Sequence, residues 1–274
     1  MKAQEQWLVS DALWARIEPL LPLHVPPPHP LGCHRKRIGN RKVLDGIFFV
    51  LRTGAQWKAL DVTGICSGST AHRRFQEWRR AGVFSRLWEE ALKEYDELKG
   101  LDWEWLSMDG AMTKAPLGGA ESGHNPTDRS KLGTKRSLLT EAAGVPIGLA
   151  IAGANQNDMK LVKATLESIP DEIDQKRRQD PGPHEMCMDK GYDFEEVRKL
   201  VADFGSTAHI PVRGQPTQNL KKDFKPRRWV VERTHSWMNR FRRILIRWEK
   251  KPANYLALLH VSCALIAFQQ ALLR

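Results

Sequence analysis

The hydrophobic pattern changes at about residue 99, and this change limits the folds that the 274-residue chain can adopt. Before it, apolar residues recur at the three- and four-residue spacing of amphipathic helices. After it, apolar runs that pair around a turn come first and alternate with helical segments later. This order predicts a mixed sheet with helices on its faces. We therefore expect a small all-α domain over residues 1–98 and an α/β domain over residues 99–274.

The first domain contains four predicted helices, near residues 11–20, 43–51, 70–80 and 82–98. Ser10-Asp11 is a start signal for the first helix, and the proline-rich run 26–30 ends it. A glycine, Gly100, stands where the fourth helix is expected to stop. The second and third helices together resemble a helix-turn-helix unit, for which the alternative is a helical bundle without a nucleic-acid role.

Arginines on the third helix are the candidates for contact with a DNA groove. Phe75 and Trp78 are expected to face inward, and the arginines are expected to face outward. These arginines are Arg73, Arg74, Arg79 and Arg80.

The second domain is expected to contain five strands and four helices. The strands are placed at 103–108, 136–140, 145–152, 186–188 and 207–212. The helices are placed at 157–168, at 194–204, from Arg228 onward, and at 254–273. The last of these is apolar on nearly every side, so we expect it to be packed inside the core or in a subunit interface.

An excess of positive charge favours a polyanionic partner. Lysines and arginines number 43 against 32 acidic residues, a net charge of +11. Ribosome binding, membrane-surface binding and simple solubility also produce basic chains. Four widely separated cysteines indicate reduced thiols, and the apolar stretch 255–268 is too short to span a bilayer. We expect a soluble, cytoplasmic protein with no membrane partner.

Three acidic residues are the candidate catalytic and metal-binding groups. Asp109 follows the apolar run 105–108, Asp189 follows 186–188, and Glu232 lies on the helix that begins near Arg228. Strand ends in an open sheet meet at one edge, where a helix crossing behind them adds a third carboxylate. Three carboxylates suit Mg²⁺, and two such ions assist phosphodiester cleavage. The alternatives are a turn at Asp109-Gly110, a solvated loop at Asp189 and an ion pair between Glu232 and Arg228.

Five ordered blocks carry a resemblance to a known family. They are Met108–Gly110, Gly123–Arg129, Lys131–Ser137, Asp189–Asp193 and Val230–Trp237. From about Leu8 to the C-terminus the chain resembles the insertion-sequence-five branch of the bacterial DDE transposases. The resemblance implies a ribonuclease H-like catalytic domain, cut-and-paste transposition, and Asp109, Asp189 and Glu232 as the metal-binding triad. Two Mg²⁺ ions would be bound, and Mn²⁺ would substitute for them.

The related pattern Tyr-x2-Arg-x3-Glu-x6-Lys is only partly present. Arg228 and Glu232 match it, but Lys225 stands at the tyrosine position and Asn239 at the lysine position. Arg240 or Arg243 is expected to replace the missing lysine in contacting the DNA end.

Basic residues of two further segments are expected to contact DNA, although exposed polar loops and charged helix faces have no such role in many proteins. The polar segment 118–135 carries His124, Arg129, Lys131 and Lys135. The helix from Arg228 adds Arg228, Arg233, Arg240 and Arg243, and Trp237 is a candidate for stacking on an unpaired base. His235 is expected on the helix surface.

The resemblance makes double-stranded DNA the partner, as terminal inverted repeats and as target DNA. Because two ends are joined in one event, we expect a homodimer, associated with the nucleoid. A nuclease or resolvase on the same scaffold, or an inactive DNA-binding regulator, remains an alternative.

Overall fold

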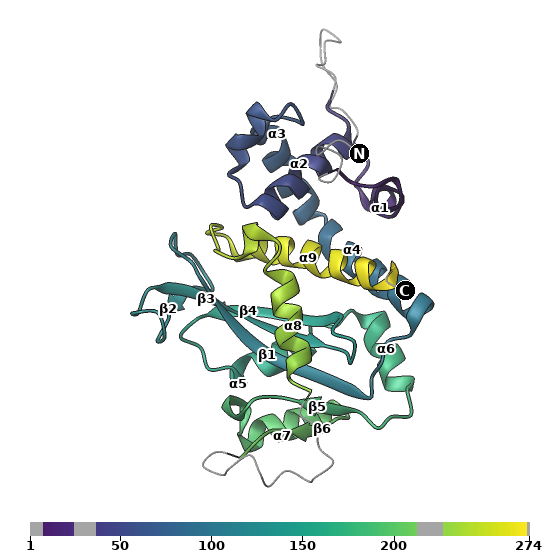
Figure 1. Ribbon diagram of the computed structural model, residues 1–274, viewed down its shortest axis with the longest axis vertical. Coiled ribbons are helices and arrows are strands. Elements are labelled where there is room, and N and C mark those ends of the chain that lie inside the picture. Colours follow the sequence, from purple (N-terminus) through teal and green to yellow (C-terminus); the bar gives the residue numbers. More distant parts are fainter. Residues whose placement is uncertain (1–7, 25–36, 213–226, 273–274) are drawn as a thin grey trace.

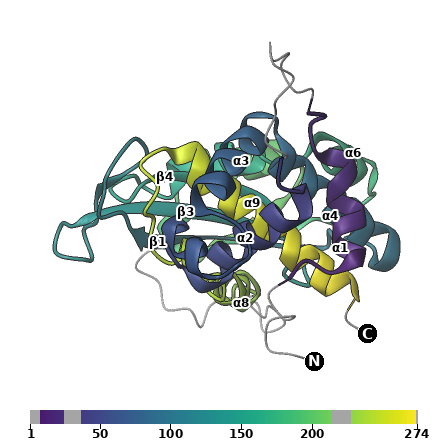
Figure 2. The same cartoon turned by 90° about the horizontal axis from the view of Figure 1, so that it is seen from above.

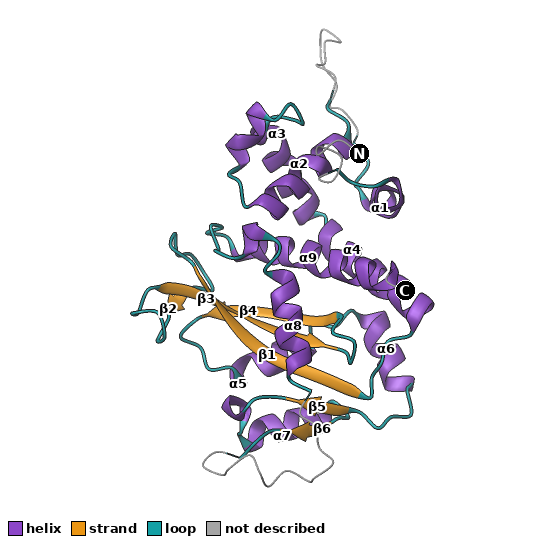
Figure 3. Ribbon diagram, in the orientation of Figure 1, coloured by secondary structure: helices purple, strands orange, loops and turns teal. Residues whose placement is uncertain are grey.

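The computed structural model describes residues 8–24, 37–212 and 227–272, and shows helices stacked above a mixed sheet (Figures 1 and 3). The helices are α1 (Asp11–Ile17), α2 (Asn40–Thr53), α3 (Gly68–Arg80), α4 (Val83–Lys99), α5 (Met159–Leu166), α6 (Asp171–Gln179), α7 (Glu195–Asp203), α8 (Trp229–Met238) and α9 (Pro252–Leu272). The strands are β1 (Trp105–Lys114), β2 (Gly123–His124), β3 (Leu132–Thr140), β4 (Pro146–Gly153), β5 (Glu185–Cys187) and β6 (Thr207–His209). The proline run 26–30 and Lys225 lie outside the described residues.

Local capping explains where the N-terminal helices begin and end. The side chains of Ser10 and Ser67 accept hydrogen bonds from backbone N–H groups of the first turns of α1 and α3. Gly54 ends α2 with a left-handed φ of 75°, a conformation that glycine adopts without steric cost. The predicted start signal at Ser10 and the predicted stop at Gly100, which follows α4, are confirmed.

The sheet has the order β2-β3-β1-β5-β6, with β4 paired to β3. Pairs β1–β3 and β3–β4 are antiparallel, whereas β1–β5 and β5–β6 are parallel. Helix α8 crosses one face, and α5 and α7 lie behind the sheet (Figure 1). This is the ribonuclease H-like α/β arrangement expected from the sequence, preceded by helices.

Strand β1 is longer than predicted. It continues to Lys114 because β3 goes on pairing with it, and Asp109 lies opposite Leu138 inside the ladder. The expectation that Asp109 directly follows the end of its strand is therefore wrong. The neighbouring strand β5 does stop, at Cys187, so Asp109 stands beside the open end of β5.

Helix α8 is shorter than predicted, because the chain turns after Met238 to cross the end of β1. Arg247 donates its backbone N–H to the Lys114 carbonyl (2.8 Å), which fixes this crossing as extended chain. A second difference is α6, which the sequence did not predict. Its nine residues are mostly charged, and the periodicity of apolar residues that marks a helix is missing.

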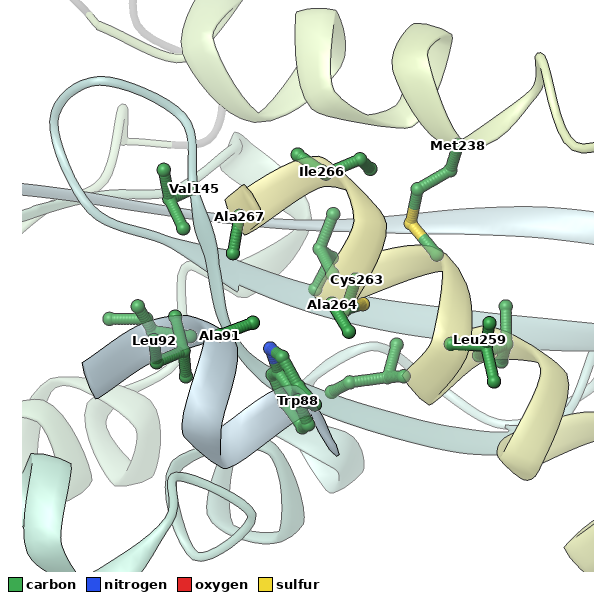
Figure 4. Close-up of a cluster of buried hydrophobic side chains, with 14 of the residues drawn as sticks. Trp88, Ala91, Leu92, Val145, Met238, Leu259, Cys263, Ala264, Ile266 and Ala267 are labelled. Atoms are coloured by element: carbon green, nitrogen blue, oxygen red, sulfur yellow. The ribbon is translucent and has the colours of Figure 1, made fainter. Parts of the chain in front are cut away.

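Helices α4 and α9 pack against each other and form the centre of the hydrophobic core. Figure 4 shows Trp88 and Ala91 of α4 beside Cys263 and Ala264 of α9, with Leu92 on the side of Val145. Trp88 also stacks on His260 at 5.3 Å between ring centroids. Among the described residues α9 is the one helix long and apolar enough to cross a membrane, yet 67% of its most apolar window is buried in the protein. The prediction of a packed helix is confirmed, with this chain's own core as the packing partner.

Candidate active site

The register between β1 and β5 brings two of the predicted catalytic acids together. Ser107 pairs with Cys187, and Asp109 and Asp189 each come two residues later on adjacent parallel chains. Residues two apart on a strand point to the same face. Ser107 donates from its hydroxyl to the Arg227 carbonyl (3.2 Å), so the face that Ser107 and Asp109 share is the one covered by the start of α8.

Glu232 is the third acid, and its position on α8 places it near the other two. The pKa of Asp109 is raised to about 6, mainly by burial, and the charges of Asp189 and Glu232 contribute in the same direction. The Gly110 N–H and the Arg228 guanidinium act in the opposite direction. Asp109 is therefore a half-buried carboxylate with two acidic neighbours, an environment that a bound cation would relieve.

The three carboxylates do not yet converge on one point. Glu232 accepts a hydrogen bond from Arg228 (2.8 Å), and Asp189 accepts one from the Gly191 N–H (2.6 Å). In the part of the chain that is described, no group of three acidic, histidine or cysteine side chains has metal-binding geometry. Glu232 keeps 51% of its side chain exposed, so it has room to rotate away from Arg228 toward the aspartates.

A buried polar layer behind Asp109 was not anticipated. The carboxylate of Asp158 receives a hydrogen bond from Lys135 (2.9 Å) and lies so close to Gly110 that a Cβ there would clash with it. Tyr192 is 1% exposed, and burial together with Asp158, Asp109 and Asp189 raises its pKa well above the ordinary range. Position alone could have drawn attention to Tyr192, which belongs to the Asp189–Asp193 block, whereas Asp158 gave no signal beyond preceding a helix.

Two family descriptions match this chain and together cover most of it. "Transposase DDE domain" matches residues 102–267, and "Putative transposase of IS4/5 family" matches residues 9–88. The chain belongs to the DDE transposases. Enzymes of this family cleave DNA and transfer strands with divalent metal ions, so this transposase is an enzyme that acts on DNA.

Relatives in Burkholderia cepacia agree with this assignment. The "Putative transposase for insertion sequence element IS402" is 34% identical over 151 residues, which are 55% of this chain and 70% of the relative. The "Insertion element IS402 uncharacterized 16.2 kDa protein" is 37% identical over 123 residues, which are 43% of this chain and 81% of the relative. The solved "Mos1 transposase paired-end complex with left transposon end" covers 76% of this chain and 79% of its own, at 13% identity and a TM-score of 0.27. So low a score relates no individual residues of the two proteins.

The arginines of α3 differ in their access to DNA. Arg73 and Arg80 are exposed, as predicted for residues on the outward face of α3, and Arg79 is half-buried. Arg74 is only 3% exposed, because its guanidinium donates to Asn40 beneath α3, so its predicted outward position is wrong. A cavity of about 870 Å³ lies beside α3, and its lining includes His24, Arg37 and Arg73.

The loop between β1 and β3 presents His124, Arg129 and Lys131 to solvent. It is attached to the rest of the transposase by Arg247, which is 1% exposed. The Arg247 guanidinium donates to the carbonyls of Ala120 (2.5 Å) and Glu121 (2.6 Å).

Lys135 does not belong to this exposed loop, contrary to prediction. It lies in β3, 6% exposed, where it binds Asp158 and the Gln156 carbonyl, so it is not available to DNA.

Helix α8 carries its basic residues in two environments. Arg233 lies between the rings of Trp229 and Trp237, at 4.8 and 4.7 Å, and donates to the Ala143 carbonyl (2.6 Å). Arg240 is exposed just beyond the end of the helix.

Two expectations near α8 are wrong because the residues concerned are buried. Arg243 is 7% exposed and pairs with Glu249 at 2.7 Å, so it cannot replace the missing lysine at the DNA end. His235, also 7% exposed, faces the sheet, and burial and Arg136 lower its pKa to about 3.

Proposed function

We propose that this transposase cuts DNA at the terminal inverted repeats of its element and joins the ends to target DNA, using Asp109, Asp189 and Glu232 as ligands of two Mg²⁺ ions. The observation that supports this most strongly is the Ser107–Cys187 register, which places Asp109 and Asp189 side by side under the helix that bears Glu232. The proposed ligands are all carboxylate oxygens, which suit a hard cation, and Mn²⁺ would substitute.

The chain's own residues would prepare the site. Bound ions would lower the pKa of the attacking water or 3′-hydroxyl and would stabilise the leaving oxygen. Asp109, between the other two acids, would be the shared ligand. When Glu232 turns toward Asp109, Arg228 loses its partner, and its planar guanidinium is free to bind a phosphate with two hydrogen bonds.

Three exposed basic surfaces would hold the DNA. The proposed contacts are Arg73, Arg79 and Arg80 on α3, His124, Arg129 and Lys131 on the β1–β3 loop, and Arg228, Arg233, Trp237 and Arg240 on and beside α8. We assign end recognition to residues 1–98 and catalysis to residues 99–274. A boundary at residue 98 falls between the two ranges that the family descriptions match.

Two further features belong to the same proposal. Joining two ends in one event requires two active sites held together, so the working form would be a homodimer on DNA. A DNA-bound enzyme with a net charge of +11 would associate with the nucleoid in the cytoplasm.

The test is substitution of each acid by alanine, with Asp203→Ala, an exposed residue at the end of α7, as the matched control. Each active-site variant should lose Mg²⁺-dependent cleavage of a terminal-repeat duplex and bind Mn²⁺ more weakly in calorimetry, while its affinity for the duplex is kept. Near-normal cleavage by any one variant would remove that residue from the triad. Cleavage by the parent without joining of a pre-cut end would instead support a nuclease.

A further inference from the structure

A cavity lined by three arginines lies where the end of α2 meets α9 and the chain that follows α8. It has a volume of about 550 Å³, and its lining comes from the end of α2, the chain that follows α8, and the second half of α9. Its charged and polar lining consists of Arg52, Arg240, Arg242, Gln269 and Gln270. None of the described residues that line it is acidic, so the cavity suits an anion.

The packing of α2 on the turn that follows α8 keeps these arginines together. Gly54, at the end of α2, lies so close to Arg242 that a Cβ on Gly54 would be 3.1 Å from the Arg242 Cβ. One residue on, Arg243 donates to the Ala55 carbonyl (3.4 Å). The end of α2 and the turn are therefore in direct contact, and this contact brings Arg52 and Arg242 to the same cavity.

The remaining lining is apolar and consists of Trp237, Phe241, Leu265, Ile266 and Leu272. Apolar surface beside arginines suits the sugar of a nucleotide better than it suits a small ion. Arginine forks and glutamine amides are donors that commonly bind phosphate oxygens.

The cavity lies along α8 from the catalytic acids. Glu232 is six residues before Met238, where α8 ends, which corresponds to about 9 Å along its axis. Arg240 lies two residues beyond that end, so the span from Glu232 to Arg240 is somewhat longer. A strand running along the helix would cover this length with about three or four nucleotides at 3.4 Å each. Figure 1 shows α8 leading from the sheet up to α9 and α2.

We propose that this cavity binds the phosphodiester backbone of the DNA strand that passes the catalytic acids, about three or four nucleotides from the cleaved bond. Helix α2 and the C-terminal part of the chain, from the end of α8 to α9, then hold one strand through a shared site. This inference rests on the proposed cleavage of DNA ends, and it adds Arg52 and Arg242 to the DNA-binding residues.

The experiment compares Arg52→Gln and Arg242→Gln with the control Arg178→Gln, a 72% exposed arginine on α6 that makes the same change in charge. Affinity for a terminal-repeat duplex is measured in the full chain over a range of salt concentrations. Each cavity variant should bind roughly tenfold more weakly and have a salt slope smaller by about one, whereas the control keeps the parent slope. A neutral methylphosphonate at the third or fourth nucleotide should weaken the parent similarly and weaken Arg242→Gln no further.

Slopes and affinities equal to those of Arg178→Gln would overturn the proposal. So would an unchanged slope accompanied by loss of self-association in sedimentation, because the cavity would then bind a second copy of the chain. Cleavage is not needed for this measurement. A chain that binds DNA through the cavity and cuts nothing would leave this inference standing and contradict the proposed function.

Discussion

Replacing Asp109 by asparagine should stabilise the metal-free transposase while abolishing its activity. Burial, Asp189 and Glu232 raise the pKa of Asp109 from an ordinary 3.8 to about 6. The folded chain thus binds the Asp109 proton more tightly than the unfolded chain does. Stability from this group is complete below about pH 3.8 and is lost as the pH rises through about 6.

The magnitude follows from the same two values. Their difference, about 6 − 3.8, at 1.36 kcal/mol per pH unit corresponds to about 3 kcal/mol. Because Asp109 is only half-buried, solvent screening lowers the expected effect to about 1–3 kcal/mol. Asparagine has nearly the same shape as aspartate and never ionises. Asp109→Asn should therefore keep, at neutral pH, the free energy of unfolding that the parent loses when Asp109 ionises.

The assay is urea unfolding in the presence of a chelator, at several pH values between about 4 and about 8. Asp109→Asn should match the parent at the acid end and exceed it above about pH 6, whereas Asp203→Asn should follow the parent throughout. If Asp109→Asn has no higher free energy of unfolding than the parent at about pH 8, ionised Asp109 does not destabilise the folded chain and the reasoning is refuted.

Three further substitutions have expected outcomes. Arg228→Lys should change the free energy of unfolding by less than about 1 kcal/mol, because the pair of Arg228 with Glu232 is exposed. It should nevertheless slow single-turnover cleavage, because lysine lacks the planar guanidinium fork, and cleavage at the parent rate would exclude a phosphate contact by Arg228. Arg247→Lys should lower the free energy of unfolding by about 3 kcal/mol and speed proteolysis of the 115–131 loop, because the carbonyls of Ala120 and Glu121 lose charged donors. Unchanged proteolysis would contradict this. Glu141, 0% exposed, has a pKa that burial raises to about 7, so its stabilisation is complete below about pH 4.5 and lost through pH 7. In Glu141→Gln this loss, about 3 kcal/mol in urea unfolding, should be absent.

The sequence was informative wherever the physics is local. Hydrophobic periodicity and capping residues identified α2, α3 and α4 within a few residues, because those signals lie next to each other in the chain. The hairpin β3–β4 was predicted for the same reason. Turn residues and alternating apolar positions are close in sequence.

Features that depend on contacts between residues far apart in the chain could not be predicted from the sequence in this way. The end of β1 depends on pairing with β3, where Asp109 lies opposite Leu138, 29 residues later (138 − 109), so the position of Asp109 inside the strand could not be foreseen. Three basic residues are buried because each binds a partner inside the protein: Arg74 binds Asn40, Lys135 binds Asp158, and Arg243 binds Glu249. A sequence pattern that counts only charge cannot distinguish an arginine that binds DNA from one that binds its own protein. The three acids predicted to be catalytic lie near one another, as their expected strand and helix positions indicated, and their catalytic role stays a prediction. The competing partners of Glu232 and Asp189 were visible only in the structure.

The packing of α4 against α9 has a consequence for synthesis of the chain. The two helices are separated by 153 residues, counted as 252 − 99, and α4 leaves the ribosome long before its partner. At about 5–20 residues per second the apolar face of α4 waits about 8–30 s for α9. During that time Trp88 and Ala91 have no native cover from α9, and chaperones or other nascent chains have access to them. The yield of active transposase should therefore depend on translation speed and chaperone supply more than the stability of the finished fold suggests.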